Sequence, residues 1–194
     1  MATERHDGLI LIADVSGFTT FVGGTVMEHG KIWMARLLDA IAERVTPRLN
    51  LSAIEGDALL FYRCFEGPDA SLLDLLSETY REFRAVARTI DPCSGCTCKA
   101  CDSGKDLQLK FIAHAGEFVE QPVAGRVQLY GHAVNVAHRM LKNHIPAKHY
   151  VFVTDAAARF LELGVDAVAH TEHTDLGDVN GRYRLLSGDA SVAS

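Results

Sequence analysis

Short hydrophobic runs alternate along this chain with longer amphipathic segments. The first run, Leu9 to Ala13, is continuous and apolar, which is typical of a strand buried on both faces. Asp14 follows it directly, and a turn is expected by Gly17. Two further apolar stretches flank Gly56-Asp57, and this pattern predicts a hairpin with Asp57 at its tip. Each of the two acids is therefore expected where a strand stops.

Helical spacing of apolar residues marks the segments between the strands. It predicts one helix between Met27 and Leu49, with Trp33 at the margin of its buried face, and a second from Gly67-Pro68 to about Thr89. A third is expected from Gly131 to Pro146, and Asp155 is expected to cap a short fourth helix, AAARFLEL. The expected inward positions of the first three are Met34, Leu37, Leu38, Ile41 and Val45; Leu72, Leu76, Phe83 and Ile90; and Val134, Ala137, Met140, Leu141 and Ile145.

Five further strands are expected in the second half of the chain. They are an alternating segment from Leu107 to His114, an extended arm from Val123 to Tyr130, a strand from Tyr150 to Thr154, and a closing antiparallel pair near Ala167–His173 and Gly181–Leu186. The order of elements predicts an α+β fold with a mixed, mostly antiparallel sheet covered by helices. We expect one domain over residues 1–187, with a cysteine-rich loop inserted at 91–104 and a disordered tail at 188–194.

Charge and hydropathy exclude some partners. The net charge of −6 provides no basic stripe for a nucleic acid, although it leaves room for a nucleotide whose phosphates are neutralised by metal ions. No apolar run is long enough to cross a bilayer, and Met1 to Gly8 lacks the apolar core of a signal peptide. We therefore expect a cytoplasmic protein that binds neither nucleic acid nor membrane.

Four of the five cysteines lie within nine residues, in the order Cys93, Cys96, Cys98 and Cys101. Two Cys-x-x-Cys turns are usual ligands of tetrahedral Zn²⁺, and cytoplasmic thiols are normally reduced, so a structural zinc site is predicted. The single residue between the two turns leaves an iron–sulfur cluster or a redox thiol set as alternatives. Cys64 stands apart and is interpreted as a small buried hydrophobe.

Asp14 and Asp57 have two interpretations from their positions alone. Brought side by side, two carboxylates repel each other unless a cation lies between them, which would make a divalent metal site. Acids before turns also commonly serve only to cap main-chain N–H groups. Position by itself does not decide between these alternatives.

Four segments carry a resemblance to a known family: LIADVSGFTTF, AIEGDALLF, LKFIAHAGEF and YGHAVNVAHRML. They resemble the catalytic core of class III adenylate and guanylate cyclases, and they occur in that family's order over most of the chain. The wider set of features is similar to an uncharacterised bacterial family of cyclase-like proteins. The resemblance implies the ferredoxin-like nucleotidyl-cyclase fold.

The resemblance also implies roles for individual residues. Asp14, Asp57 and the Val15 carbonyl match the ligands of Mg²⁺ or Mn²⁺, while Asn135 matches the residue that positions the ribose and Arg139 the one that stabilises charge at the α-phosphorus. The matching nucleotide-binding positions are Gly17, Phe18, Thr19, Ala53 and Gln128.

Three departures from the family pattern affect substrate recognition. The positions that select the purine hold Ala53 and Gln128, which reproduce neither the ATP pair nor the GTP pair, and the phosphate-binding lysine falls close to Asp178. Arg182 is near enough in sequence to compensate for that lysine. The resemblance implies a head-to-tail homodimer that binds a purine nucleoside triphosphate, and cyclase activity is one interpretation of it. The alternative is a degenerate module that binds a nucleotide, or only a partner, without turnover.

Overall fold

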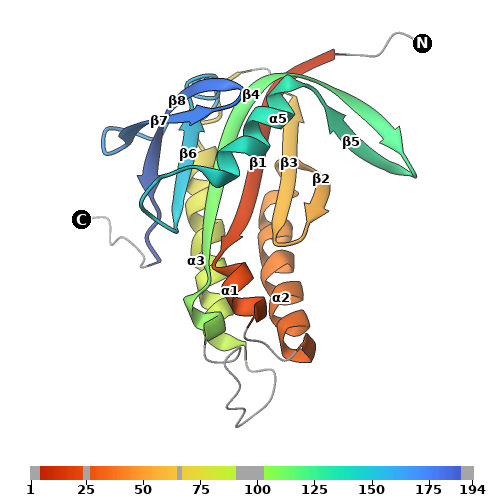
Figure 1. Cartoon of the computed structure of the whole chain (residues 1–194), viewed down its shortest axis with the longest axis vertical. Coiled ribbons are helices and arrows are strands. Elements are labelled where there is room, and N and C mark those ends of the chain that lie inside the picture. Colours follow the sequence, from red (N-terminus) through yellow and green to blue (C-terminus); the bar gives the residue numbers. More distant parts are fainter. Residues whose placement is uncertain (1–4, 24–26, 65–66, 91–102, 189–194) are drawn as a thin grey trace.

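The computed structural model describes residues 5–23, 27–64, 67–90 and 103–188. Its centre is an eight-stranded sheet with the order β2-β3-β1-β4-β6-β8-β7, and β5 pairs with β4 outside this path (Figure 1). All pairings are antiparallel except that of β4 with β6. The strands are β1 (Arg5–Ser16), β2 (Asn50–Glu55), β3 (Ala58–Cys64), β4 (Gln108–Val123), β5 (Arg126–Tyr130), β6 (Tyr150–Thr154), β7 (Val168–Thr174) and β8 (Gly177–Leu185). The predicted mixed, mostly antiparallel sheet is confirmed.

Helices cover both faces of this sheet. α1 (Phe18–Gly23), α2 (Met27–Val45) and α3 (Leu72–Thr89) lie on one face, and α5 (His132–Arg139) with the 3-10 turn η2 (Met140–Lys142) lies on the other (Figure 1). β1 serves both cores, because alternate residues of a strand point to opposite faces. Leu9, Leu11 and Ala13 join the core under α2 and α3, and Ile10 and Ile12 join the core under α5. The prediction of a strand buried on both faces is confirmed.

Two predictions for the chain outside the strands were wrong: the burial of Trp33 and the helix after Asp155. Trp33 is completely buried rather than marginal, and its ring packs on Gly104, which begins the 3-10 turn η1 (Gly104–Asp106). The segment AAARFLEL forms consecutive turns instead of a helix. The Asp155 N–H bonds to the Asn180 carbonyl of β8, so contacts with a neighbouring strand outweigh the local preference for helix.

The third predicted helix ends early. α5 stops at Arg139 and η2 at Lys142, well before Pro146. Asn143 explains this end: its Nδ2 donates to the Met140 carbonyl at 2.6 Å, and its Oδ1 accepts from Ile145 N at 3.0 Å and from the Tyr150 hydroxyl at 2.9 Å. These bonds satisfy main-chain groups that would otherwise continue the helix.

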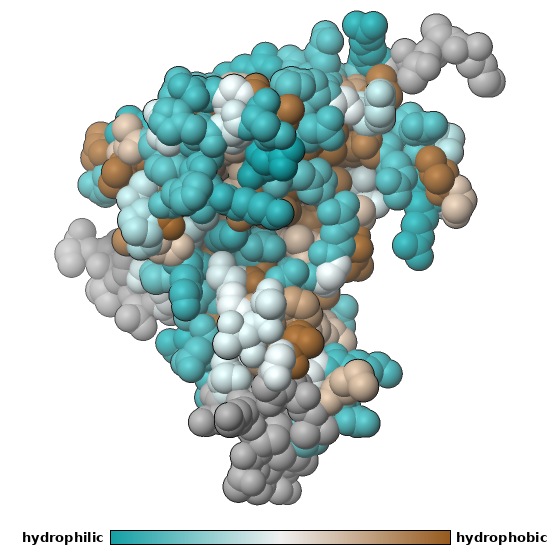
Figure 2. Space-filling view, in the orientation of Figure 1, coloured by the Kyte–Doolittle hydropathy of each residue, from teal (hydrophilic) through white to brown (hydrophobic). Residues whose placement is uncertain are grey.

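The predicted arm is one strand of a long hairpin. β4 is 16 residues long, continues beyond His114, and turns at Ala124 and Gly125, both at positive φ, into β5. The hairpin projects beyond the helices, and Figure 2 shows hydrophobic residues at its tip, where Val123 and Val127 are exposed. The Ser52 hydroxyl of β2 donates to the Val127 carbonyl at 3.1 Å, which ties the hairpin to the edge of the sheet.

Several predictions concern the cysteines and the chain ends. Cys64 is exposed at the end of β3, so its assignment to the core was wrong. The four-cysteine set lies in residues 91–102, outside the described residues, as does the predicted tail from 189 onward. No helix in the described part of the chain is long and apolar enough to cross a membrane.

Candidate nucleotide and metal site

Asp14 lies near the end of the central strand, between two neighbours. It is opposite Ala58 of β3 and Lys110 of β4. Counting from Ile10 and Ile12 by the period of two, its side chain lies on the face that α5 covers. Sheet register therefore fixes the position of this carboxylate.

Asp57 is held beside Asp14 by the main chain. Gly56 takes up the positive φ of +66° that the turn between β2 and β3 requires, and the Asp57 carbonyl accepts a hydrogen bond of 3.1 Å from the Val15 N–H. The pKa of Asp57 is raised, first by burial and then by the negative charge of Asp14. The two predicted acids are thus brought together where the end of β1 meets the turn between β2 and β3.

Lys110 is a third charged residue of this site, and the sequence analysis assigned it no role. Its Nζ lies 3.1 Å from Asp14 Oδ2 and donates to the Leu141 carbonyl at 2.9 Å. Both side chains of the ion pair are only 16% exposed, so solvent screens their attraction less than at the surface. The available signal was the alternation of Lys110 with Leu109 and Phe111, which places it on the same face as His114.

The oxygen groups at these strand ends are of the kind that binds a hard divalent cation. Two carboxylates and a main-chain carbonyl are oxygen ligands of the type that Mg²⁺ and Mn²⁺ prefer. Burial, and after it the negative charge of Asp14, raises the pKa of Asp57. Among the described residues, no group of three or more His, Cys, Asp or Glu side chains could hold a metal ion by itself. A cation here would therefore need further oxygens, such as those of a phosphate.

Asn135 and Arg139 lie on α5, the helix that covers the face of the sheet carrying Asp14. Asn135 is exposed, and Arg139 Nη2 donates to Asp175 Oδ2 at 2.7 Å in the turn between β7 and β8. His138, on the same helix, lies 3.5 Å from Glu55 of β2. Within the described residues, no hydrogen bond or ion pair joins Asn135 or Arg139 to Asp14 or Asp57. Lys110, which contacts both Asp14 and the Leu141 carbonyl, is the link between the acids and the segment that follows Arg139.

The other predicted nucleotide-binding positions divide into two groups. Gly17 adopts a positive φ of +95° after β1, which lets Phe18 begin α1, and Thr19 on α1 is exposed. Ala53 on β2 is partly buried, whereas Gln128 on β5 is exposed. The bond between Ser52 and Val127 brings the chain segments of Ala53 and Gln128 together, beside an open pocket of about 740 Å³ that Ala53, Tyr62 and Arg126 help to line.

His114 is partly buried and contacts another strand of the sheet. Its Nδ1 lies 2.8 Å from the hydroxyl of the buried Thr154 on β6. Burial, with a smaller contribution from His132, lowers its pKa from 6.5 to about 4. The imidazole is therefore neutral near pH 7.

Comparisons with solved structures define the class to which this fold belongs. The structure of the guanylyl cyclase Cya2 matches the whole chain with a TM-score of 0.74 at 15% identity and is covered over 98% of its length. The adenylyl cyclase CyaB from P. aeruginosa matches with a TM-score of 0.68 at 9% identity, with 100% of each chain covered. A bacterial light-regulated adenylyl cyclase matches 95% of this chain and 53% of its own with a TM-score of 0.70 at 13% identity. The architecture is that of class III nucleotidyl cyclase domains, as the sequence motifs predicted.

Sequence comparison then identifies the family. Residues 34–150 match the model of a family described as "Protein of unknown function (DUF2652)", and the chain belongs to this family. The "Uncharacterized protein Rv2561/Rv2562" of Mycobacterium tuberculosis is 35% identical over 136 residues, which are 70% of this chain. The match spans 64% of the length of that relative.

Proposed function

We propose that this protein binds a purine nucleoside triphosphate with Mg²⁺ or Mn²⁺ at Asp14, Asp57 and the Val15 carbonyl, and that it forms a cyclic nucleotide. The observation that carries the proposal is the main-chain bond between Val15 and Asp57, together with the raised pKa of Asp57 beside Asp14. A pair of carboxylates held at a fixed separation is preorganised for a divalent cation. Lys110 adds a fixed positive charge next to this pair, which offsets part of the charge of a triphosphate.

In the proposed reaction, the ribose 3'-hydroxyl attacks the α-phosphorus. A bond forms between O3' and the α-phosphorus, the bond to the bridging oxygen of the β-phosphate breaks, pyrophosphate leaves, and the hydroxyl proton passes to solvent. The bound cations would activate the hydroxyl and neutralise the leaving group. Asn135 would orient the ribose, and Arg139 would donate to the oxygens of the α-phosphate as their charge grows.

The proposed assembly is a head-to-tail homodimer. Among the described residues, no hydrogen bond or ion pair joins Asn135 or Arg139 to the acids of the same chain, and both residues are exposed on α5. A second copy would bring these residues to the acids of the first. In the proposed dimer, each site would therefore take its two acids from one chain and its asparagine and arginine from the other.

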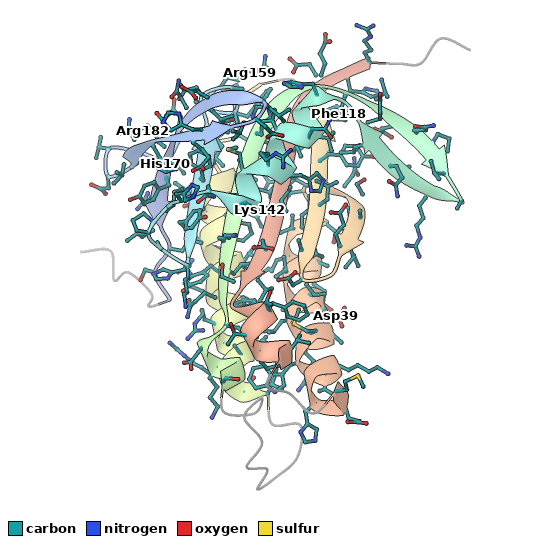
Figure 3. All side chains as sticks on the ribbon, viewed as in Figure 1. Asp39, Phe118, Lys142, Arg159, His170 and Arg182 are labelled. Carbon is teal, nitrogen blue, oxygen red and sulfur yellow. The ribbon has the colours of Figure 1, made fainter. Side chains whose placement is uncertain are left out.

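The experiment is an assay of the purified full chain with Mn²⁺ and, separately, ATP, GTP, CTP and UTP, with mass detection of cyclic products. We expect a cyclic purine nucleotide from wild type and its loss in Asp57→Ala. Asp39→Asn is the matched control, because Asp39 is an exposed acid on α2 (Figure 3) and should leave the product unchanged. Wild type that makes no product from any of the four nucleotides would contradict the catalytic proposal.

A second candidate is a cyclase-like module that binds nucleotide without turnover. It is favoured by Ala53, which has no polar group for a base, and by the occupation of Arg139 by Asp175. Binding of a nucleoside triphosphate, measured by calorimetry with Mn²⁺, without any cyclic product would select this function.

A further inference from the structure

The turn between β7 and β8 presents an acid to Arg139. Arg139 Nη2 and Asp175 Oδ2 are 2.7 Å apart, although the two residues belong to different elements and are 36 positions apart in the chain. Asp175 occupies a tight turn in which the Thr174 hydroxyl donates to the Gly177 carbonyl at 2.7 Å and accepts from Leu176 N at 3.0 Å. These bonds fix the turn that carries the carboxylate.

A second contact fixes the hairpin against the segment that follows Arg139. Glu172 of β7 is 4% exposed and accepts from the His144 N–H at 2.9 Å, while its other oxygen lies 2.6 Å from His144 Nδ1. His170 of β7 lies 3.0 Å from the same carboxylate, and Figure 3 shows His170 and Lys142, the last residue of η2, on this side of the sheet. The position of Asp175 relative to Arg139 is therefore set by the fold and not by one flexible side chain.

The pair is stable enough to form and weak enough to exchange. Its side chains are 45% and 63% exposed, and ion pairs at that exposure contribute little net free energy. A phosphate offers a guanidinium more acceptor oxygens and more negative charge than one carboxylate does. Asp175 occupies Nη2 and neutralises the charge of the guanidinium, so it weakens the attraction of Arg139 for a phosphate, and the two anions compete.

We infer that Asp175 is an internal competitor of phosphate for Arg139, and that displacement of Asp175 is a built-in step of anion binding at α5. The inference deepens the proposed function and rests on it, because it assigns a regulatory acid to the same arginine. The hairpin also carries Asp178, whose carboxylate lies 2.8 Å from His173 Nδ1 and is thereby engaged elsewhere.

The test is calorimetric titration of the full chain with inorganic tripolyphosphate, which needs no turnover. Asp175→Asn should bind about two- to five-fold more tightly than wild type, the range expected from releasing an exposed ion pair. Asp166→Asn removes the same charge from an exposed position just before β7, outside any proposed site, and should leave the affinity unchanged. In an Arg139→Gln background, Asp175→Asn should have no effect, which separates competition for Arg139 from a general change of charge.

Four outcomes would overturn the inference: no binding of tripolyphosphate, an unchanged or lower affinity in Asp175→Asn, an equal gain in Asp166→Asn, or an equal gain without Arg139. The proposed catalysis fails separately, if wild type binds tripolyphosphate but forms no cyclic nucleotide. If product does form, Asp175→Asn should lower KM more than it changes kcat, because the effect lies on binding.

Discussion

Lys110 Nζ and Asp14 Oδ2 lie 3.1 Å apart where the end of β1 pairs with the start of β4 in the middle of the sheet. The same ammonium group donates to the Leu141 carbonyl just beyond α5. One lysine therefore links the acid pair to the helical segment that covers it. This link has opposite consequences for the fold and for cation binding.

Replacing Lys110 should separate these two consequences. Lys110→Met should lower the free energy of unfolding by about 1–3 kcal/mol, because Asp14 loses its partner in a mostly buried position. The same change should tighten Mn²⁺ binding roughly tenfold, since a positive charge beside the carboxylates no longer repels the ion. Urea titration and calorimetry measure the two effects. Lys110→Arg keeps the charge and is the control; equal Mn²⁺ affinity in both variants would contradict the prediction.

Asp69 links Arg48, just after α2, and Arg63 of β3 to Ser71 at the start of α3. It accepts from Arg63 Nη1 at 2.7 Å, from Arg48 Nη2 at 2.9 Å and from the Ser71 hydroxyl at 2.7 Å. Against the opposing effect of burial, the bonds from Ser71 and the two arginines hold the pKa of its carboxyl well below the usual range. Asp69→Asn should cost about 2–3 kcal/mol of stability at pH 7.

The pH dependence provides a further check on Asp69. A carboxyl whose pKa is lower in the folded state stabilises the protein above its unfolded pKa, and this stabilisation is lost as the pH falls through the folded pKa. The difference in stability between wild type and Asp69→Asn should therefore shrink on acidification below about pH 4. A constant difference from pH 7 to pH 3 would argue against the ion pairs as its cause.

His114 should destabilise the fold in mild acid. Its pKa is lowered from 6.5 to about 4, so the unfolded chain takes up a proton first, and the stabilisation present above pH 6.5 is lost as the pH falls toward 4. His114→Asn, which retains a polar group for Thr154, should remove this part of the acid sensitivity, about 1–3 kcal/mol in chemical denaturation.

His173 serves as the opposite case. The hydrogen bond and charge of Asp178 raise its pKa, so its contribution is present at low pH and is lost as the pH rises through the folded pKa. His173→Asn should leave the acid limb of the stability curve as steep as in wild type. If both variants changed that limb alike, the assignment to His114 would be wrong.

Gly104 lies so close to Trp33 of α2 that the structure has no room for a side chain there. A Cβ there would lie 2.7 Å from the Cε2 and Cζ2 atoms of Trp33, whose ring is completely buried and cannot move aside. Gly104→Ala should therefore lower the free energy of unfolding by about 1–3 kcal/mol. Gly23→Ala, at the end of α1, meets no atom within 4 Å and should be nearly neutral in the same thermal or urea titration.

Local pattern was sufficient for most elements of the fold. The buried run of β1, the Gly56-Asp57 hairpin and the apolar stripe of α3 each depend on neighbouring residues, and each was confirmed. The wrong predictions depend on specific contacts that a pattern does not reveal. Asn143 ends α5 early through its bonds to Met140, Ile145 and Tyr150, and a bond from Asp155 to β8 holds the following segment in turns. Propensity cannot reveal such contacts.

The candidate site shows the same division. Asp14 and Asp57 were predicted from motifs, but Lys110 was missed because its role depends on the register of β1 against β4, strands that are far apart in the sequence. The pairing of Arg139 with Asp175 was also missed, since a turn residue carries no periodic signal. Register and turn placement are tertiary properties, so a single sequence defines them poorly.

The bond between the Val15 amide and the Asp57 carbonyl has one more consequence. Because peptide groups set the spacing of positions 14 and 57, any side chains introduced there would inherit that spacing. A histidine at either position would shift the preference toward ions that accept nitrogen, such as Zn²⁺, without altering the strands. At the proposed site, a single substitution would thus change the preferred ion, while its location would change only if a strand slipped.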